Sequence, residues 1–270
     1  MTGSLPDLSP LELEIDPKGC CARLYESDAV RWLLDGQLHP GGERLTRRLA
    51  QFAGIERGQR VLDVACGTGA TALLLARELE CEVVGVDLGS RSIAQATDAA
   101  RAAGLAARVR FVLGDAEELP FPDAGFDVAL SECSLCTFPD KRRAIAEMAR
   151  VVGAGGAIAI ADVTADLKVL PEQLRSAAAR VACVADARSV DDYASLLRDA
   201  GWERVAIEPH DDDLRAMADR VEARLRIARM LAPRGEQRDR AAEAASLARM
   251  AIDAVARGTL GYALIVARRL

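Results

Sequence analysis

An apolar segment that runs directly into a glycine-rich turn constrains the fold more than any other feature of the chain. Residues 60–66 have the pattern of a buried strand, Gly67 and Gly69 follow at once, and residues 70–80 have a helical pattern. Glycines at such a turn let a ligand approach the backbone closely. The first N–H groups of the helix favour an anionic or polar ligand group. The segment therefore predicts a strand–turn–helix unit that binds a small ligand.

Short apolar runs alternate with helical patterns along most of the chain, as in proteins with a parallel sheet. The remaining strands are predicted at residues 82–87, 109–113, 127–131, 157–161, 204–208 and 262–267. Helices are predicted at residues 90–103, 141–152 and 190–200, and the glycine-rich residues 153–156 are expected to form a turn. The predicted fold class is α/β, with a doubly wound, mostly parallel seven-stranded sheet.

Two segments lie outside this alternation and set the predicted domain boundaries. Residues 1–51 form an N-terminal arm or lid with a helical stretch near residues 24–34. Residues 52–210 form the core with the ligand site, residues 211–257 a helical insertion, and residues 258–270 the final strand of the core. Spacings of three and four in the insertion predict a helix with one apolar face, made of Leu214, Met217, Val221, Leu225 and Ala228.

Composition limits the classes of protein to which the chain can belong. The 270 residues carry a net charge of −6, which gives no reason to expect a nucleic-acid partner. The longest apolar runs are far shorter than a membrane span, and residues 1–10 lack the features of a signal peptide. We therefore expect a cytoplasmic protein without a membrane partner. Its seven cysteines should then be free thiols, metal or metalloid ligands or redox-active pairs, and not a structural disulfide framework.

Three acidic residues distinguish between two kinds of ligand at the glycine turn. Asp87 lies twenty positions after Gly67, where a ribose-binding carboxylate is expected, so these residues alone also fit an NAD-dependent oxidoreductase. Asp63, inside the first strand, would repel a pyrophosphate but suits the cationic amino group of a bound amino acid. Asp63 could also cap the adjacent loop, and the two roles are compatible. Asp115, after the third strand, could accept a hydrogen bond from an adenine amino group. Asp63 and Asp115 therefore disfavour the oxidoreductase.

The ordered set of motifs resembles the class I S-adenosylmethionine-dependent methyltransferases. The set spans roughly residues 58–165 and comprises Asp63 to Gly69, Val84-Gly85-Val86-Asp87, Gly114-Asp115-Ala116 and Leu119-Pro120-Phe121. The resemblance implies S-adenosyl-L-methionine as the cofactor. It places Asp63, Gly67 and Gly69 at the methionine portion, Asp87 at both ribose hydroxyls, and Asp115 with Ala116 at adenine. The sequence departs from the family at Ala65, where many relatives carry a glycine.

Cysteines are the main candidates for the acceptor side of the site. Cys133 and Cys136 follow the fourth strand at the carboxyl end of the sheet, where doubly wound folds bind ligands. Cys183 precedes the helix at residues 190–200, and Cys20 and Cys21 lie in the arm, which could fold over the same end. Converging thiolates would suit a thiophilic metal or metalloid.

Other roles are open for several of these side chains. Cys66 and Cys81 lie within or beside core strands, so we expect them to pack as small apolar residues. The pair Cys133 and Cys136 could instead belong to a zinc site, although a single pair is weak support. The two histidines, His39 and His210, have no partner motif of a catalytic base, and we expect surface or turn positions for both.

Residues 131–141 resemble the arsenite methyltransferases, in which a cysteine after the fourth strand precedes a turn like Pro139-Asp140-Lys141. The resemblance implies that Cys133 and Cys183 bind trivalent arsenic, with Cys20 or Cys21 as a third ligand and a thiol reductant as partner. The sequence departs from that family near residues 38–42, where a further cysteine is missing, and in the insertion. The alternatives are a methyltransferase for a small organic acceptor and a non-catalytic thiol sensor of metals.

Overall fold

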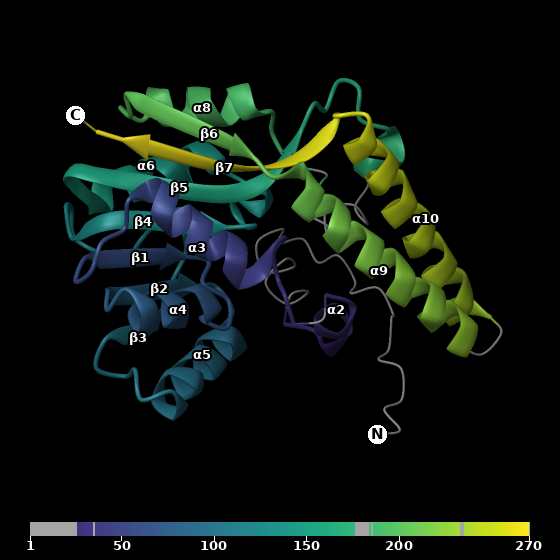
Figure 1. The fold of residues 1–270 in the computed structure, drawn as a ribbon, viewed down its shortest axis with the longest axis horizontal. Coiled ribbons are helices and arrows are strands. Elements are labelled where there is room, and N and C mark those ends of the chain that lie inside the picture. Colours follow the sequence, from purple (N-terminus) through teal and green to yellow (C-terminus); the bar gives the residue numbers. More distant parts are fainter. Residues whose placement is uncertain (1–25, 35, 176–183, 185, 233–234, 270) are drawn as a thin grey trace.

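Seven strands form one sheet in the order β3-β2-β1-β4-β5-β7-β6 (Figure 1). The structure is a computed structural model that describes residues 26–34, 36–175, 184, 186–232 and 235–269. The strands are β1 (Arg60–Val64), β2 (Glu82–Asp87), β3 (Val109–Leu113), β4 (Phe126–Glu132), β5 (Val152–Ala165), β6 (Arg204–Pro209) and β7 (Leu260–Arg268). β7 runs antiparallel to both β5 and β6, and every other pair is parallel. The predicted doubly wound, mostly parallel sheet is thus confirmed.

Helices cover both faces of the sheet and bury two apolar clusters. The helices that pack mainly on one face are α3 (Gly42–Ala53) and α4 (Ala70–Glu78), and those on the other are α6 (Lys141–Val151) and α8 (Val190–Asp199). α5 (Ser90–Ala102) packs beside β2 and β3. Side chains alternate along β1, where Val61 belongs to the first cluster and Leu62 and Val64 to the second. Asp63 therefore points toward the face that carries α3 and α4.

The fifth strand differs from the sequence prediction. Residues 153–156, expected to form a turn, lie inside β5 and form a bulge, because the pairing shifts from Phe126 opposite Val152 to Val128 opposite Ala157. A side chain at Gly156 would have its Cβ 2.5 Å from the carbonyl oxygen of Asp127, so glycine permits this close approach. β5 also extends to Ala165, because it pairs with β7 along this whole stretch.

Two long helices follow β6 and form a hairpin that extends past the sheet (Figure 1). They are α9 (Asp211–Leu231) and α10 (Glu236–Ala256). The predicted apolar face of the insertion is confirmed, because Leu214, Leu225 and Ala228 are buried. Glu222, buried between the helices, accepts a hydrogen bond from Arg249 at 2.7 Å and pairs with Arg226. In the part of the chain that the structure describes, no helix has both the length and the apolar character that crossing a bilayer requires.

The described part of the N-terminal arm begins with a short helix, α2 (Asp28–Leu33), whose first turn is capped by the Ser27 hydroxyl. α2 packs beside α9, and residues 36–41 lead from it into α3. Within α3, Leu45 and Leu49 are completely buried against the sheet. The predicted boundaries at residues 51, 210 and 257 stay predictions.

Candidate active site

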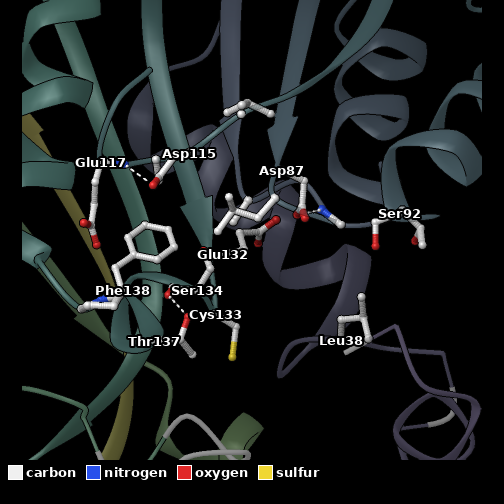
Figure 2. Close-up of a pocket in the computed structure, with 18 of the residues that line it drawn as sticks. Leu38, Asp87, Ser92, Asp115, Glu117, Glu132, Cys133, Ser134, Thr137 and Phe138 are labelled. Atoms are coloured by element: carbon white, nitrogen blue, oxygen red, sulfur yellow. Dashed lines mark hydrogen bonds between the residues drawn. The ribbon is translucent and has the colours of Figure 1, made fainter. Parts of the chain in front are cut away.

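A pocket lies at the carboxyl ends of the parallel strands, beside the glycine-rich turn (Figure 2). Its empty volume, which includes space open to solvent, is about 960 Å³. Segments far apart in the sequence line it, among them Arg31, Leu38, Gly67, Asp87, Asp115, Ala116, Glu132, Cys133, Thr137 and Phe138. This is the position at which doubly wound folds bind ligands.

The glycine turn follows β1 in a conformation that only small residues tolerate well. Gly67 and Gly69 have φ angles of +52° and +81°, and Ala65 also lies in the left-handed region with φ +59°. A Cβ at Gly69 would lie 2.5 Å from Phe111 Cζ, so a side chain cannot fit there. Ala65, the departure from the family motif, therefore carries backbone strain that a glycine would avoid.

Asp87 lies at the end of β2 and bridges two loops. Its Oδ2 accepts a hydrogen bond from the Gly67 N–H at 2.8 Å, and its Oδ1 accepts one from the Gly89 N–H at 2.7 Å. Burial raises the pKa of Asp87, while these two backbone hydrogen bonds oppose the shift. Since Asp87 also lines the pocket, it both shapes the glycine turn and faces the space predicted for a ribose.

Asp63 is 2% exposed and does not line the pocket, but it lies close enough to the pocket residues Glu132 and Asp87 for their charges to act on it. Burial raises its pKa well above the ordinary range, and the negative charges of Glu132 and Asp87 raise it further. A backbone hydrogen bond from Ala72 in α4 opposes the shift, but Oδ2 has no hydrogen-bond partner among the described residues. Asp63 therefore accepts a hydrogen bond from the first turn of α4, as expected if it caps the adjacent loop. Its Oδ2 can still accept a hydrogen bond from a cationic group.

Asp115 and Ala116 lie on the far side of the pocket, after β3 (Figure 2). Asp115 Oδ1 accepts a hydrogen bond from the Glu117 N–H at 2.8 Å, which fixes the carboxylate at the pocket wall. Ala116 is buried and also lines the pocket. Four of the six residues predicted for the cofactor thus line one pocket, namely Gly67, Asp87, Asp115 and Ala116, whereas Asp63 and Gly69 do not line it. The contacts of all six with a cofactor stay a prediction.

Glu132 is a site residue that the sequence analysis missed. It ends β4, and its side chain is 4% exposed. The carboxylate accepts hydrogen bonds from Thr71 Oγ1 at 2.5 Å and from Thr46 Oγ1 at 3.1 Å. Glu132 therefore joins α3, α4 and β4 at the pocket wall, close enough to Asp63 to raise its pKa. The signal in the sequence was an acidic residue at the carboxyl end of a buried strand.

The chemistry of these acidic side chains suits a cationic ligand. Asp63, Asp87 and Glu132 gather around the glycine turn, and burial together with mutual repulsion raises the pKa of Asp63. A positively charged group beside Asp63 and Glu132 would offset that repulsion and would supply a donor for Asp63 Oδ2. The residues present therefore fit the ammonium group and sulfonium centre of S-adenosyl-L-methionine.

Cys133 is the predicted acceptor residue that the structure brings into the pocket. It follows β4 with φ +52°, a strained conformation for a residue other than glycine, and its N–H donates to the Ala161 carbonyl at 2.7 Å. Figure 2 shows its sulfur pointing toward the side of the pocket on which Thr137 and Leu38 lie. Cys183, Cys20 and Cys21 lie outside the described residues.

The other described cysteines are buried in the core. Cys66 and Cys81 are buried, as predicted, and burial raises the pKa of both thiols. Cys136 is 1% exposed, and its N–H donates to Asp162 Oδ2 at 2.8 Å. No group of three or more His, Cys, Asp and Glu side chains in the described ranges could hold a metal ion. The zinc alternative at Cys133 and Cys136 therefore gains no support.

Both histidines lie outside the pocket lining. His39 lies in the loop before α3, donates from Nδ1 to the Pro40 carbonyl at 3.0 Å, and has its Nε2 3.4 Å from Thr46 Oγ1. His210 lies after β6, with its two ring nitrogens 2.8 Å from Glu208 and 3.3 Å from Asp213. Both side chains are mostly buried, at 14% and 16% exposed, so the expected surface positions are wrong, whereas the loop positions fit the turn alternative. His39 Nδ1 also lies 3.9 Å from Glu132 Oε1.

Comparison with known proteins gives the family of this fold and site. A family model described as a methyltransferase domain matches residues 55–201, which is more than half of the 270-residue chain. The chain belongs to this methyltransferase domain family. It is also 31% identical over 260 residues to the O-methyltransferase cnsE of Penicillium expansum, a match that covers 90% of this chain and 89% of that protein.

Other methyltransferases are about equally similar. The chain is 36% identical over 170 residues to the 27-O-demethylrifamycin SV methyltransferase of Amycolatopsis mediterranei, but it spans only 61% of that relative's length. It is 32% identical over 222 residues to the arsenite methyltransferase of Halobacterium salinarum, which covers 74% of this chain and 54% of that protein. The predicted methyltransferase class is thus confirmed, whereas the arsenite family is one relative among several.

Solved structures share this fold. A phosphoethanolamine N-methyltransferase 2 of Haemonchus contortus, in complex with S-adenosyl-L-methionine, superposes with a TM-score of 0.78 at 18% identity over 94% of this chain and 60% of that one. The cyclase SpnF superposes with a TM-score of 0.75 at 27% identity, over 92% of this chain and 95% of that one. The class I methyltransferase-like fold is confirmed, and so is S-adenosyl-L-methionine as the cofactor of the family.

Proposed function

We propose that the protein transfers a methyl group from S-adenosyl-L-methionine to a small organic acceptor. The observation that carries this proposal is the composition of the acceptor wall. Among the described cysteines only Cys133 lines the pocket, beside the hydroxyl of Thr137 and the apolar side chains of Phe138 and Leu38. Such a mixed wall suits an organic molecule. The relative that spans the largest share of this chain among those above is an O-methyltransferase.

The cofactor, when bound, supplies a methyl group activated by a positively charged sulfur. Asp63 and Glu132 would hold its amino end, because they combine burial, negative charge and, at Asp63 Oδ2, an acceptor without a partner in the described chain. Asp87 would accept from the ribose hydroxyls, and Asp115 with Ala116 would face adenine. These residues fix one reactant against the acceptor wall, so that the reaction gains from proximity and alignment.

Glu132 is the ionisable side chain best placed to act on both reactants. Two threonine hydroxyls donate to its carboxylate, yet each carboxylate oxygen can accept more than one hydrogen bond. Glu132 also lines the pocket, so a ligand there can donate a further hydrogen bond to its carboxylate. Glu132 would therefore stabilise the cationic cofactor and could orient a hydroxyl group of the acceptor.

A second candidate acceptor is trivalent arsenic, favoured by one specific observation. The sulfur of Cys133 points into the pocket (Figure 2), and the relative from Halobacterium salinarum is named as an arsenite methyltransferase. In this case Cys133 and Cys183 would bind arsenic as thiolates, with Cys20 or Cys21 as a third ligand and a thiol as reductant. Soft thiolate ligands suit this element.

One experiment separates the two acceptors. The wild-type chain, with cofactor carrying a labelled methyl group, is incubated with a panel of phenols and alcohols and, separately, with arsenite and a thiol. We expect label in an organic product and none in methylated arsenic. Cys133→Ser should retain organic methylation within about threefold of the wild type, because the substitution conserves size.

The matched control is Cys81→Ala, which removes a buried thiol just before the start of β2, whereas the pocket lies at the end of that strand. Methylated arsenic formed by the wild type and by Cys81→Ala, but not by Cys133→Ser, would establish the second candidate in place of the first.

A further inference from the structure

The helix that begins beside Asp87 lacks a cap of its own. α5 starts after Gly89, which has no side chain and makes no capping hydrogen bond. The first N–H groups of a helix need acceptors, and an N-cap side chain usually accepts from the third residue of the helix. In α5 that residue is Ser92, and its N–H donates at 2.8 Å to Glu26 Oε1. The cap of α5 therefore comes from the N-terminal arm, 66 positions earlier in the chain.

Glu26 and Asp87 meet at this one helix end. Asp87 Oδ1 accepts a hydrogen bond from the Gly89 N–H, and Glu26 Oε1 accepts one from the Ser92 N–H, one helical turn later. A Cβ at Gly89 would lie 2.5 Å from Glu26 Oε1 and 3.1 Å from Asp87 Oδ1, so the glycine provides the space that both carboxylates use. The positive end of the helix dipole stabilises the two negative charges.

The same arm segment contacts α5 further along and reaches the pocket. Arg31 donates to Gln95 Oε1, and Asp28 pairs with Arg91 at 3.4 Å. Arg31 also lines the pocket, together with Leu38 from the following loop. The segment from Glu26 to Arg31 thus follows the first turns of α5 and forms part of the wall around the ribose end.

We propose that Glu26 is a positioning residue for the cofactor: by capping α5 it docks the arm over the ribose end of the pocket. The proposal rests on the assignment of this pocket to the cofactor and is independent of the acceptor. Because Arg31 and Leu38 of the docked arm line the same pocket, a cofactor that contacts them favours docking of the arm, and docking favours the cofactor to the same extent.

The test is equilibrium binding of S-adenosylhomocysteine to the full chain, by calorimetry. Glu26→Ala removes the cap and should weaken binding about five- to tenfold, and Glu26→Gln, which keeps an oxygen but loses the charge, about two- to fivefold. Asp98→Asn is the matched control, because it removes a carboxylate from an exposed pair with Arg101 within α5. Its affinity should stay within about twofold of the wild type.

Amide hydrogen exchange distinguishes this role from a purely structural one. In the wild type, S-adenosylhomocysteine should slow exchange at Ser92 and in α2, and in Glu26→Ala this ligand-dependent protection should be lost from α2. Equal affinities in the wild type and both Glu26 variants would overturn the proposal alone. A wild-type chain that does not bind S-adenosylhomocysteine would overturn the cofactor assignment and this proposal together.

Discussion

At the residue scale, the carboxyl group of Asp63 is unfavourable to ionise in the folded chain. It is buried inside β1, has an oxygen without a partner among the described residues, and lies near two further carboxylates. Burial raises its pKa, so the folded chain binds a proton there more tightly than the unfolded chain does. Its contribution to the free energy of unfolding is therefore present at low pH. That contribution is lost as the pH rises from about 3.9, the ordinary value, through the raised pKa.

A substitution at Asp63 should separate stability from ligand binding. Asp63→Asn removes the buried charge, so it should raise the free energy of unfolding of the ligand-free protein at pH 8 by on the order of 1 kcal/mol. The difference should shrink as the pH falls, because protonation of Asp63 removes the same charge from the wild type. Affinity for S-adenosylhomocysteine should fall about tenfold, because a charge-assisted hydrogen bond is lost.

Urea unfolding from pH 4 to pH 8 and calorimetry measure the two effects. Asp98→Asn, an exposed carboxylate in α5, is the control and should change neither. A stability difference that is constant across this pH range would contradict the assigned role of the buried charge.

At the element scale, the connection from β1 to α4 depends on how closely its backbone approaches β3. Gly69 has φ +81°, and its missing side chain leaves the space that the Phe111 ring fills. Gly104, after α5, also has a positive φ, of +70°, but no atom lies within 4 Å of a Cβ built there. The two glycines therefore share a conformational requirement and differ in their surroundings.

This pair allows a matched test of the turn. Gly104→Ala should cost about 1 kcal/mol of stability, because only the backbone conformation is unfavourable. Gly69→Ala should cost about 3 kcal/mol or more, because the new methyl group also collides with Phe111. Denaturant unfolding of both variants measures the difference, and equal losses would show that the packing at Gly69 tolerates a side chain.

The sequence was sufficient for elements whose boundaries are set locally. Helix starts at Ala70, Ser90 and Lys141 were predicted to the residue, because glycine turns and the Asp140 cap mark them. The extent of β5 was not predictable, because its last residues extend along β7, about one hundred positions later. The bulge at residues 153–156 also depends on its partner strand, since glycines alone indicate a turn equally well.

The residues of the candidate site also fall into those that local sequence patterns predict and those that such patterns miss. Asp63 lies near the end of β1, Asp87 ends β2 and Asp115 follows β3, so their positions along the strands predicted that they lie at one end of the sheet. Glu26 and Arg31 were missed, because their role depends on where the arm docks, and no local pattern encodes that contact. The part of the cysteine prediction that rests on Cys183, Cys20 and Cys21 stays a prediction.

At the scale of the whole molecule, the described part of the arm and the helical hairpin contact each other. Arg224 of α9 donates to the Trp32 carbonyl, and its guanidinium carbon lies 5.5 Å from the centre of the Trp32 ring. Arg44, at the start of α3, pairs with Asp213 at the start of α9. The hairpin therefore contacts the arm at Trp32, while Glu26 attaches the arm to α5 of the core.

Removing the contact between Arg224 and Trp32 should loosen the arm without disturbing the core. Arg224→Ala loses a cation–π contact and a hydrogen bond, so we expect affinity for S-adenosylhomocysteine to fall about threefold and exchange at α2 amides to accelerate. Arg226→Ala is the control, because the ion pair of Arg226 among the described residues is with Glu222 within the hairpin. Unchanged exchange in α2 of Arg224→Ala would show that the hairpin does not hold the arm.

The contact between Trp32 and Arg224 joins residues 192 positions apart, and this separation matters during synthesis. The arm leaves the ribosome first, whereas α9 leaves it after six of the seven strands. The docking surface for the arm is therefore incomplete until most of the chain has been translated. Glu26 and Ser92, by contrast, both leave the ribosome early, so the attachment of the arm to α5 can form before α9 is made. The helical hairpin therefore completes the docking of the arm and does not begin it.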